Sequence, residues 1–147
     1  MSDSEPVDRP TAWPFMAALT IAVIVVIATG LVNLFSGDDP PTPEVEVARA
    51  AVGQNDALQR QNYPDFLLYT CPEQQDSEDD VLGAQRESVE EQGERYVDDV
   101  TDIKIDGDRA TATVTYHFGK TPDTKIPVEM TFVRIDGGWK VCSPATG

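Results

Sequence analysis

The sequence predicts an α+β protein in which one transmembrane helix precedes a domain of about three helices and a curved antiparallel sheet of about four strands. Three observations predict this order. Residues 12–35 are apolar and uncharged, residues 43–92 place apolar side chains at helical spacing, and apolar and polar residues alternate after Val100. Because the helices precede the strands along the chain, we expect the helices to cover one face of the sheet.

The apolar run from Ala12 to Phe35 is long enough to cross a bilayer, which needs roughly 20 apolar residues. Backbone groups in lipid must pair within the segment, so the run is expected to be helical. A buried core helix would be amphipathic, whereas this run is apolar on every side. A cleaved signal peptide would begin with a basic region, but residues 1–10 contain three acids and one arginine. We therefore expect an uncleaved, single-pass anchor.

The anchor divides the chain into an acidic cytoplasmic tail at 1–11, the transmembrane helix at 12–35, a linker at 36–42 and an extracytoplasmic domain at 43–147. Arg9 precedes the helix and the next basic residue is Arg49, which favours a cytoplasmic N-terminus. The expected location is therefore the cell membrane, with the domain outside.

Both cysteines, Cys71 and Cys142, lie in the domain after the anchor. An even count of cysteines outside the membrane predicts a disulfide. Two buried free thiols in a cytosolic domain would be the alternative. If the bond forms, the two Cα atoms should lie within about 7 Å of each other.

Charge and motifs exclude several kinds of function. The chain has 26 acidic and 11 basic residues, and its net charge of −15 opposes binding to nucleic acid. The acidic segment 73–80 lacks the spacing and the glycine turn of a calcium loop, whereas Ser77 and Asp80 fit a helix capping box. No metal site and no cofactor are expected.

Three helices are expected before the sheet. Thr42 fits an N-cap with Pro43 at the first helical position, which predicts a helix over about 43–61. A short second helix is expected at 65–70, and a third over about 78–92 that ends at Gly93.

Alternation predicts strands from about 100 to 105, 109–118, 126–135 and 139–142, with a loop at 119–125. Folding the chain about Pro122 would pair Phe118 with Ile126. The same register pairs Tyr116 with Val128, Val114 with Met130 and Ala112 with Phe132.

A two-residue turn at Asp136 and Gly137 would place Val141 beside Phe132 and Trp139 opposite Arg134. Strict alternation then directs Cys142 away from the covered face, where a bond to Cys71 would have to form. A bulge at Gly138, or departure of the chain from the strand after Val141, would resolve the conflict. The sequence leaves both open.

Three helices followed by a sheet that ends in Asp-Gly-Gly-Trp-Lys-Val-Cys (136–142) resemble the nuclear transport factor 2-like (NTF2-like) superfamily of α+β cones. With the acidic tail and the apolar run, the chain is similar to single-pass membrane proteins of actinobacteria, including Mce-associated proteins and lumazine-binding-like domains. The resemblance covers about 45–142. It implies a non-enzymatic role at the membrane, although the superfamily also contains enzymes.

Catalysis is not expected. An isomerase-like site would need a carboxylate base inside the apolar cone, and no Asp or Glu alternates onto the inner face of either long strand. The only histidine, His117, lies on the opposite face beside threonines. No catalytic residue is assigned, and an isomerase-like or dehydratase-like enzyme is a remote alternative.

The favoured function is a membrane-anchored extracytoplasmic interaction module, an accessory subunit of a cell-envelope or membrane protein complex. Small residues in the anchor would let another transmembrane helix approach: Ala17, Ala18, Ala22, Ala28 and Gly30. The alternative is a binder of a small apolar ligand or lipid. Its pocket would be lined by Tyr116, Met130, Phe132 and Trp139, the same side chains that would otherwise fill the core.

Overall fold

The structure, a computed structural model, describes residues 40–144. The elements in chain order are α2 (Pro43–Gln59), α3 (Tyr63–Tyr69), the short 3-10 helix η1 (Pro72–Gln74), α4 (Glu78–Gln92), β1 (Arg95–Asp106), β2 (Arg109–Phe118), β3 (Thr121–Ile135) and β4 (Gly138–Val141). Three α-helices with a four-stranded antiparallel sheet confirm the expected α+β architecture.

The predicted transmembrane helix at 12–35 and its small residues Ala17, Ala18, Ala22, Ala28 and Gly30 lie outside the described residues. Within residues 40–144, none of the helices combines the length and the apolar character needed to cross a bilayer. The anchor therefore stays a prediction.

Local capping sets the helix starts. The Thr42 side chain accepts a hydrogen bond from the amide of Val45, and Ser77 accepts one from Asp80. The expected starts at Pro43 and Glu78 are confirmed. Helix α3 begins at Tyr63, two residues before the expected start, because the Asn62 side chain caps it.

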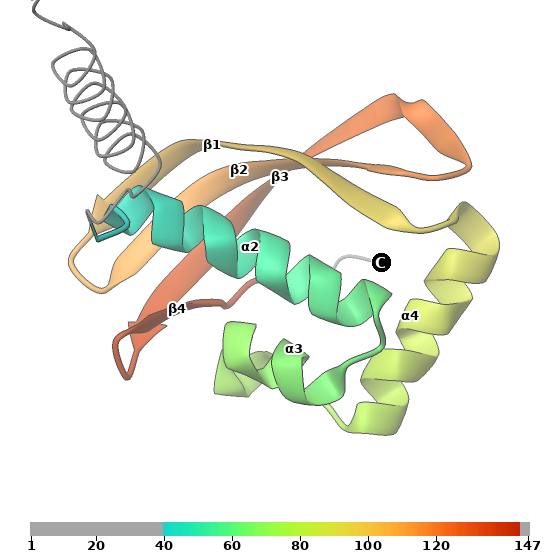
Figure 1. Cartoon of the computed structure of the whole chain (residues 1–147), viewed down its shortest axis with the longest axis horizontal. Helices are drawn as coiled ribbons and strands as arrows, with labels where there is room; N and C mark the ends of the chain where they lie inside the picture. The colour runs from blue at the N-terminus through green and yellow to red at the C-terminus, as the bar shows by residue number, and fades with distance from the viewer. Residues whose placement is uncertain (1–39, 145–147) are drawn as a thin grey trace, which may run out of the picture. The chain divides into compact units, whose positions relative to one another are not determined.

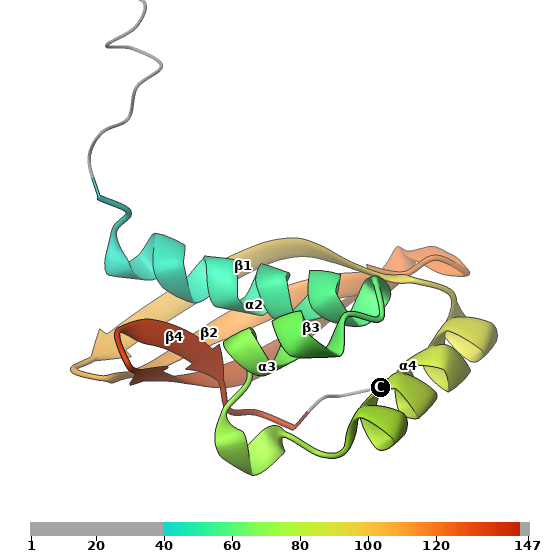
Figure 2. The ribbon, with the colours of Figure 1, turned by 60° about the horizontal axis from the view of Figure 1, so that its bottom comes forward.

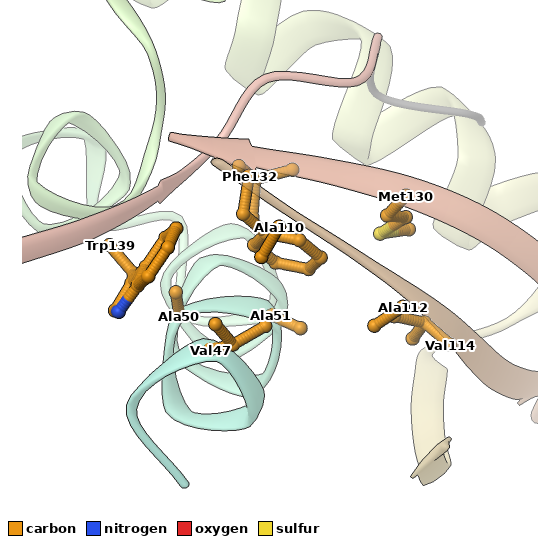
Figure 3. Packing of buried hydrophobic residues seen from close by; sticks show 10 residues of the cluster. Val47, Ala50, Ala51, Ala110, Ala112, Val114, Met130, Phe132 and Trp139 are labelled. Atoms are coloured by element: carbon orange, nitrogen blue, oxygen red, sulfur yellow. The ribbon is translucent and has the colours of Figure 1, made fainter. Parts of the chain in front are cut away.

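The four strands follow the order β1-β2-β3-β4, and α2 lies across one face of the sheet (Figure 1, Figure 2). Alternate residues of β2 are buried beneath the helix. Figure 3 shows Val47, Ala50 and Ala51 of α2 packed toward Ala110 and Phe132 of the sheet. Burial of these apolar side chains is the main source of the domain's stability.

The expected pairing of β2 with β3 is wrong by two residues. Phe118 was expected opposite Ile126, but Ile126 pairs with Tyr116. The turn occupies residues 119–120 rather than a loop around Pro122, so β3 begins at Thr121. The same offset gives the pairs Val114–Val128, Ala112–Met130 and Ala110–Phe132. Side chains alternate with a period of two, so a shift of two keeps every core residue on the core face.

Strand β1 is longer than expected, since it begins at Arg95 rather than near Val100. Its pairing with β2 shifts register between Val97 and Asp99 and again between Thr101 and Lys104. These irregularities interrupt the alternation on which the sequence prediction depended.

The closing hairpin has the expected register. Phe132 pairs with Val141, and Arg134 pairs with Trp139. Helix α3 reaches this hairpin through an isolated bridge between Thr70 and Val141. The sheet is therefore tied to the helical half at the end of β4.

Cys71 and Cys142 form a disulfide with Cα atoms 5.0 Å apart, as predicted. The strand has no bulge at Gly138, and β4 ends at Val141. The amide of Cys142 still donates to the carbonyl of Thr131 at 2.8 Å, and the chain departs from the strand after this bond. The amide of Cys71 donates to the carbonyl of Val141 at 2.8 Å, which holds the two segments together.

Candidate functional site

Helix α4 is held at its ends rather than by burial. None of its residues is buried, and both views place it beyond the C-terminal end of α2 (Figure 1, Figure 2). Just before its first turn, the hydroxyl of Tyr63 donates to the carbonyl of Asp76 at 2.6 Å. A helix fixed in this way leaves space along its inner face.

Gly93 joins the other end of α4 to the sheet. Its φ of +86° is in the left-handed region, which favours glycine. The amide of Lys120 donates to the carbonyl of Gln92 at 3.0 Å, and the Lys120 ammonium donates to the carbonyl of Glu90. A Cβ added at Gly93 would lie 3.0 Å from the Lys120 nitrogen. The β2–β3 turn therefore caps α4 and requires glycine at this position.

A cavity of about 390 Å³ lies between α4 and the pair α2 and α3. Its apolar wall includes Leu58 of α2, Phe66 of α3 and Val81 of α4, and its polar groups include Gln59 and Arg95. The volume is within the range of small-molecule pockets, roughly 300–1,000 Å³. This cavity is the candidate functional site.

Arg95 supplies a cation to the cavity wall. Its Nε donates to Asn55 Oδ1 at 2.8 Å, and its guanidinium carbon lies 5.3 Å from the centre of the Tyr116 ring. Burial lowers the pKa of Arg95 because desolvation disfavours its charged form. The exposed acids Asp76 and Asp80 also line the cavity, so both signs of charge border it.

Gln59 differs from the other glutamine on the inner side of α2. Both amide atoms of Gln59 are buried and have no hydrogen-bond partner within residues 40–144. By contrast, the Gln54 amide nitrogen donates to the Thr70 hydroxyl at 2.9 Å. A buried amide without a partner destabilises the fold, so an unpaired group beside a cavity requires an explanation.

A second cavity, of about 330 Å³, is lined by residues of all three long strands, including Lys104, Arg109, Thr131 and Val133. Thr111 pairs with both Lys104 and Thr131, which places these three side chains on the face of the sheet opposite α2. We find no unpaired buried polar atom among the residues described at this site.

A charged cluster lies where β1, β2 and β3 change register. His117 Nδ1 is 2.8 Å from one carboxylate oxygen of Asp98, and the Lys125 ammonium is 2.9 Å from the other. The Tyr96 ring stacks on the His117 ring at 5.2 Å. Hydrogen bonds from His117 and Lys125 hold the pKa of the Asp98 carboxyl below its usual value.

Among the described residues, no group of three or more His, Cys, Asp and Glu side chains could hold a metal ion.

The residues expected to line a pocket are all buried in the described domain. Met130, Phe132 and Trp139 belong to the core cluster beneath α2, and Arg134 lies 4.8 Å over the Trp139 ring. Tyr116 lies outside that cluster and contacts Arg95 at the edge of the cavity. Phe132 also lines the second cavity.

Sequence reasoning did not identify Gln59 or Arg95. Arg95 shares the inner face of β1 with Val97, but the register shifts farther along β1 interrupt the alternation, so the pattern gave no signal for Arg95. Gln54 lies at helical spacing between Val47 and Leu58 on the buried side of α2, which is a signal of a buried amide, whereas Gln59 lies beside that row and gives no such signal.

Comparison with known proteins gives one family match. Residues 73–145 match the C-terminal domain of the low molecular weight antigen MTB12. The match spans 73 of the 147 residues, including α4 and the four strands but neither α2 nor α3. No curated protein sequence matches the chain.

Two solved structures are similar at low identity. A candidate NTF2-like transpeptidase from Campylobacter jejuni has a TM-score of 0.45 and 15% identity, with 65% of this chain and 96% of that chain covered. A candidate dehydratase of the NTF2-like family from Streptomyces avermitilis has a TM-score of 0.45 and 17% identity, with 72% and 100% covered. These names describe those proteins and are not transferred to this chain.

Proposed function

We propose that this chain is a non-enzymatic, membrane-anchored interaction module whose NTF2-like domain lies outside the cell membrane, where it serves as an accessory subunit of an envelope or membrane complex. The order of helices and strands, together with the match of residues 73–145 to the MTB12 C-terminal domain, supports the NTF2-like assignment. The apolar run at 12–35 supports the anchor.

The Cys71–Cys142 disulfide carries the proposal. It joins the end of α3 to the end of β4, and disulfides of this kind persist in oxidising compartments. A domain that follows an apolar run and contains a disulfide is expected on the outer side of the membrane.

Two exposed valines on one side of α2 are the surface that we propose contacts a protein partner. Val45 and Val52 are seven residues apart, so they lie on the same side of the helix two turns apart, and both remain about half exposed at 49% and 47%. Leu68 of α3 is also exposed. We place the contact with a partner on this side of α2.

The arrangement of polar side chains favours binding over catalysis. In the part of the chain that the structure describes, His117 contacts Asp98 and Lys125, without a serine or cysteine nucleophile in that cluster. Hydrolytic nucleophiles need such a base within hydrogen-bond reach.

The proposal is tested by purifying the full chain from its native membrane in mild detergent. A partner should be recovered with the wild type and lost with the double variant Val45→Lys and Val52→Lys. The control Thr101→Lys changes an exposed residue of β1 and should retain the partner. Recovery of the chain alone, or a partner that also binds the double variant, would contradict the proposed surface.

The membrane arrangement has a separate test. A reporter that is active only outside the cytoplasm should work when it is fused after Gly147 and fail when it is fused before Trp13. The opposite pattern would overturn both the orientation and the argument from the disulfide.

The second candidate function is binding of a small apolar ligand, and the cavity beneath α4 favours it. Met130 and Trp139 are buried in the core, so a ligand would occupy the α4 cavity instead of the pocket expected from the sequence. A ligand that binds only the folded state raises thermal stability. A lipid extract that fails to raise the melting temperature of the full chain would count against this candidate.

A further inference from the structure

We infer that the cavity beneath α4 binds a small, uncharged and largely apolar molecule whose amide-like group pairs with the side chain of Gln59. The inference rests on the second candidate function and does not depend on the membrane anchor. It follows from three features of the cavity: the unpaired amide, the charges that border it and the loose packing of α4.

The amide of Gln59 is the first feature. Its nitrogen is a donor and its oxygen an acceptor, and both are buried without a partner among residues 40–144. Leu58, Phe66 and Val81 supply apolar wall to the cavity that Gln59 also lines. Sites for small molecules combine such walls with a few polar groups that fix the orientation of the ligand.

The charges indicate an uncharged ligand. The Arg95 guanidinium in the wall opposes a cation, and Asp76 and Asp80 oppose an anion. Arg95 also has partners within the fold, since it donates to Asn55 and lies against the Tyr116 ring. A neutral group that both donates and accepts, such as a carboxamide, satisfies Gln59 without burying a new charge.

The packing of α4 provides access. The Gln59 amide is closed to solvent, so pairing requires the side chain or the cavity wall to move. Helix α4 forms one wall and has no buried residue, whereas α2 on the opposite side has six, including Val47, Gln54 and Leu58. The loosely packed wall is the one expected to move.

The first experiment uses three probes of similar shape on the full chain in nanodiscs. Benzamide donates and accepts, acetophenone only accepts, and benzoate carries a charge. Binding is followed by NMR of the side-chain amides, with the Gln59 signal assigned by its loss in Gln59→Leu. Benzamide should shift this signal and bind about three to ten times more tightly than acetophenone, the range expected for a net hydrogen bond. Benzoate should bind more weakly than benzamide.

Gln59→Leu should abolish the preference for benzamide over acetophenone. The inference is overturned if no probe shifts the Gln59 signal, if benzoate binds most tightly or if the preference persists in Gln59→Leu. Stabilisation by a lipid extract without any effect of benzamide would also overturn it, while leaving the second candidate function in place.

The second experiment needs no ligand and uses Gln54 as the matched control on the same helix. Gln59→Leu removes an unpaired buried amide, so the melting temperature should rise by roughly 3–5 °C. Gln54→Leu removes the hydrogen bond to Thr70 and should lower it. If both variants lose stability equally, Gln59 has a structural partner and the inference is wrong.

Discussion

Helices α2 and α4 are similar in length but are held by different interactions. Helix α2 buries six residues against the sheet and α3, whereas α4 buries none and is held by contacts at its ends and by the partly buried Val81. Burial makes α2 part of the core, while the loose packing of α4 leaves a cavity beside it. The comparison shows a closely packed region that stabilises the fold and a loosely packed region beside a cavity.

The largest expected effect comes from removing the disulfide, which joins the end of α3 to the end of β4 in the closely packed part of the domain. Cys71→Ser and Cys142→Ser should each destabilise the domain by about 2–5 kcal/mol. The double variant should cost little more, because the two sulfurs act as one unit. Urea unfolding measures the loss, and thiol labelling of the unreduced protein checks that the bond exists. Two labelled thiols in the wild type would remove the premise.

Leucine truncation compares the two helices directly. Leu58 of α2 is buried with Ala57 and Phe66, so Leu58→Ala should cost about 2–4 kcal/mol. Leu82 of α4 is only partly buried, and Leu82→Ala should cost less than about 1 kcal/mol. Equal losses in chemical denaturation would show that α4 contributes to the core as much as α2 does.

Two glycine substitutions compare the stability contributed by the C-terminal end of α4 with that contributed by its middle. Gly93→Ala should destabilise by about 1–3 kcal/mol, because φ is +86° and the new Cβ would crowd the Lys120 amide. Gly83 has no atom within 4 Å of an added Cβ, so Gly83→Ala should stabilise by about 0.5–1 kcal/mol. Thermal unfolding of both variants measures these changes. A neutral effect at Gly93 would mean that the connection to the β2–β3 turn does not hold α4.

The smallest expected effect lies away from both helices, at Asp98. Its pKa in the folded state is held below the ordinary value of 3.8, so it stabilises the fold above that pH, and this contribution is lost as pH falls through the folded pKa. His117→Gln should lower stability slightly at pH 7 and make the loss of stability toward pH 3 shallower, so that the variant and the wild type converge at low pH. Urea unfolding between pH 7 and pH 3 tests this, and an unchanged acid slope would contradict the assigned contact.

The ends of α4 and the turn of the closing hairpin could be predicted because their signals are local. Ser77 caps the start of α4 and Gly93 caps its end, and each cap acts on the adjacent turn of the helix. The turn at Asp136 and Gly137 sets the register of β3 with β4. The pairing of β2 with β3 could not be predicted in the same way. A shift of two residues buries the same side chains, so the hydrophobic pattern does not distinguish the two registers.

The cavity could not be predicted from the pattern either. From the sequence, Tyr116, Met130, Phe132 and Trp139 were expected to line a pocket or to fill the core, because apolar residues on an inner strand face can do either. The structure buries all four. The space lies instead beneath α4, and its existence depends on how far that helix stands from Leu58 and Phe66.

The sequence by itself determined the element order, the starts of α2 and α4, the closing hairpin and the prediction that Cys71 and Cys142 pair. These features depend on capping, turn chemistry and alternation within a few residues, or on the count of cysteines. Only the tertiary structure decided the β2–β3 register, the path of the chain at Cys142 and the unpaired amide of Gln59. Each of these depends on the positions of residues distant in the chain, which periodicity along the sequence does not encode.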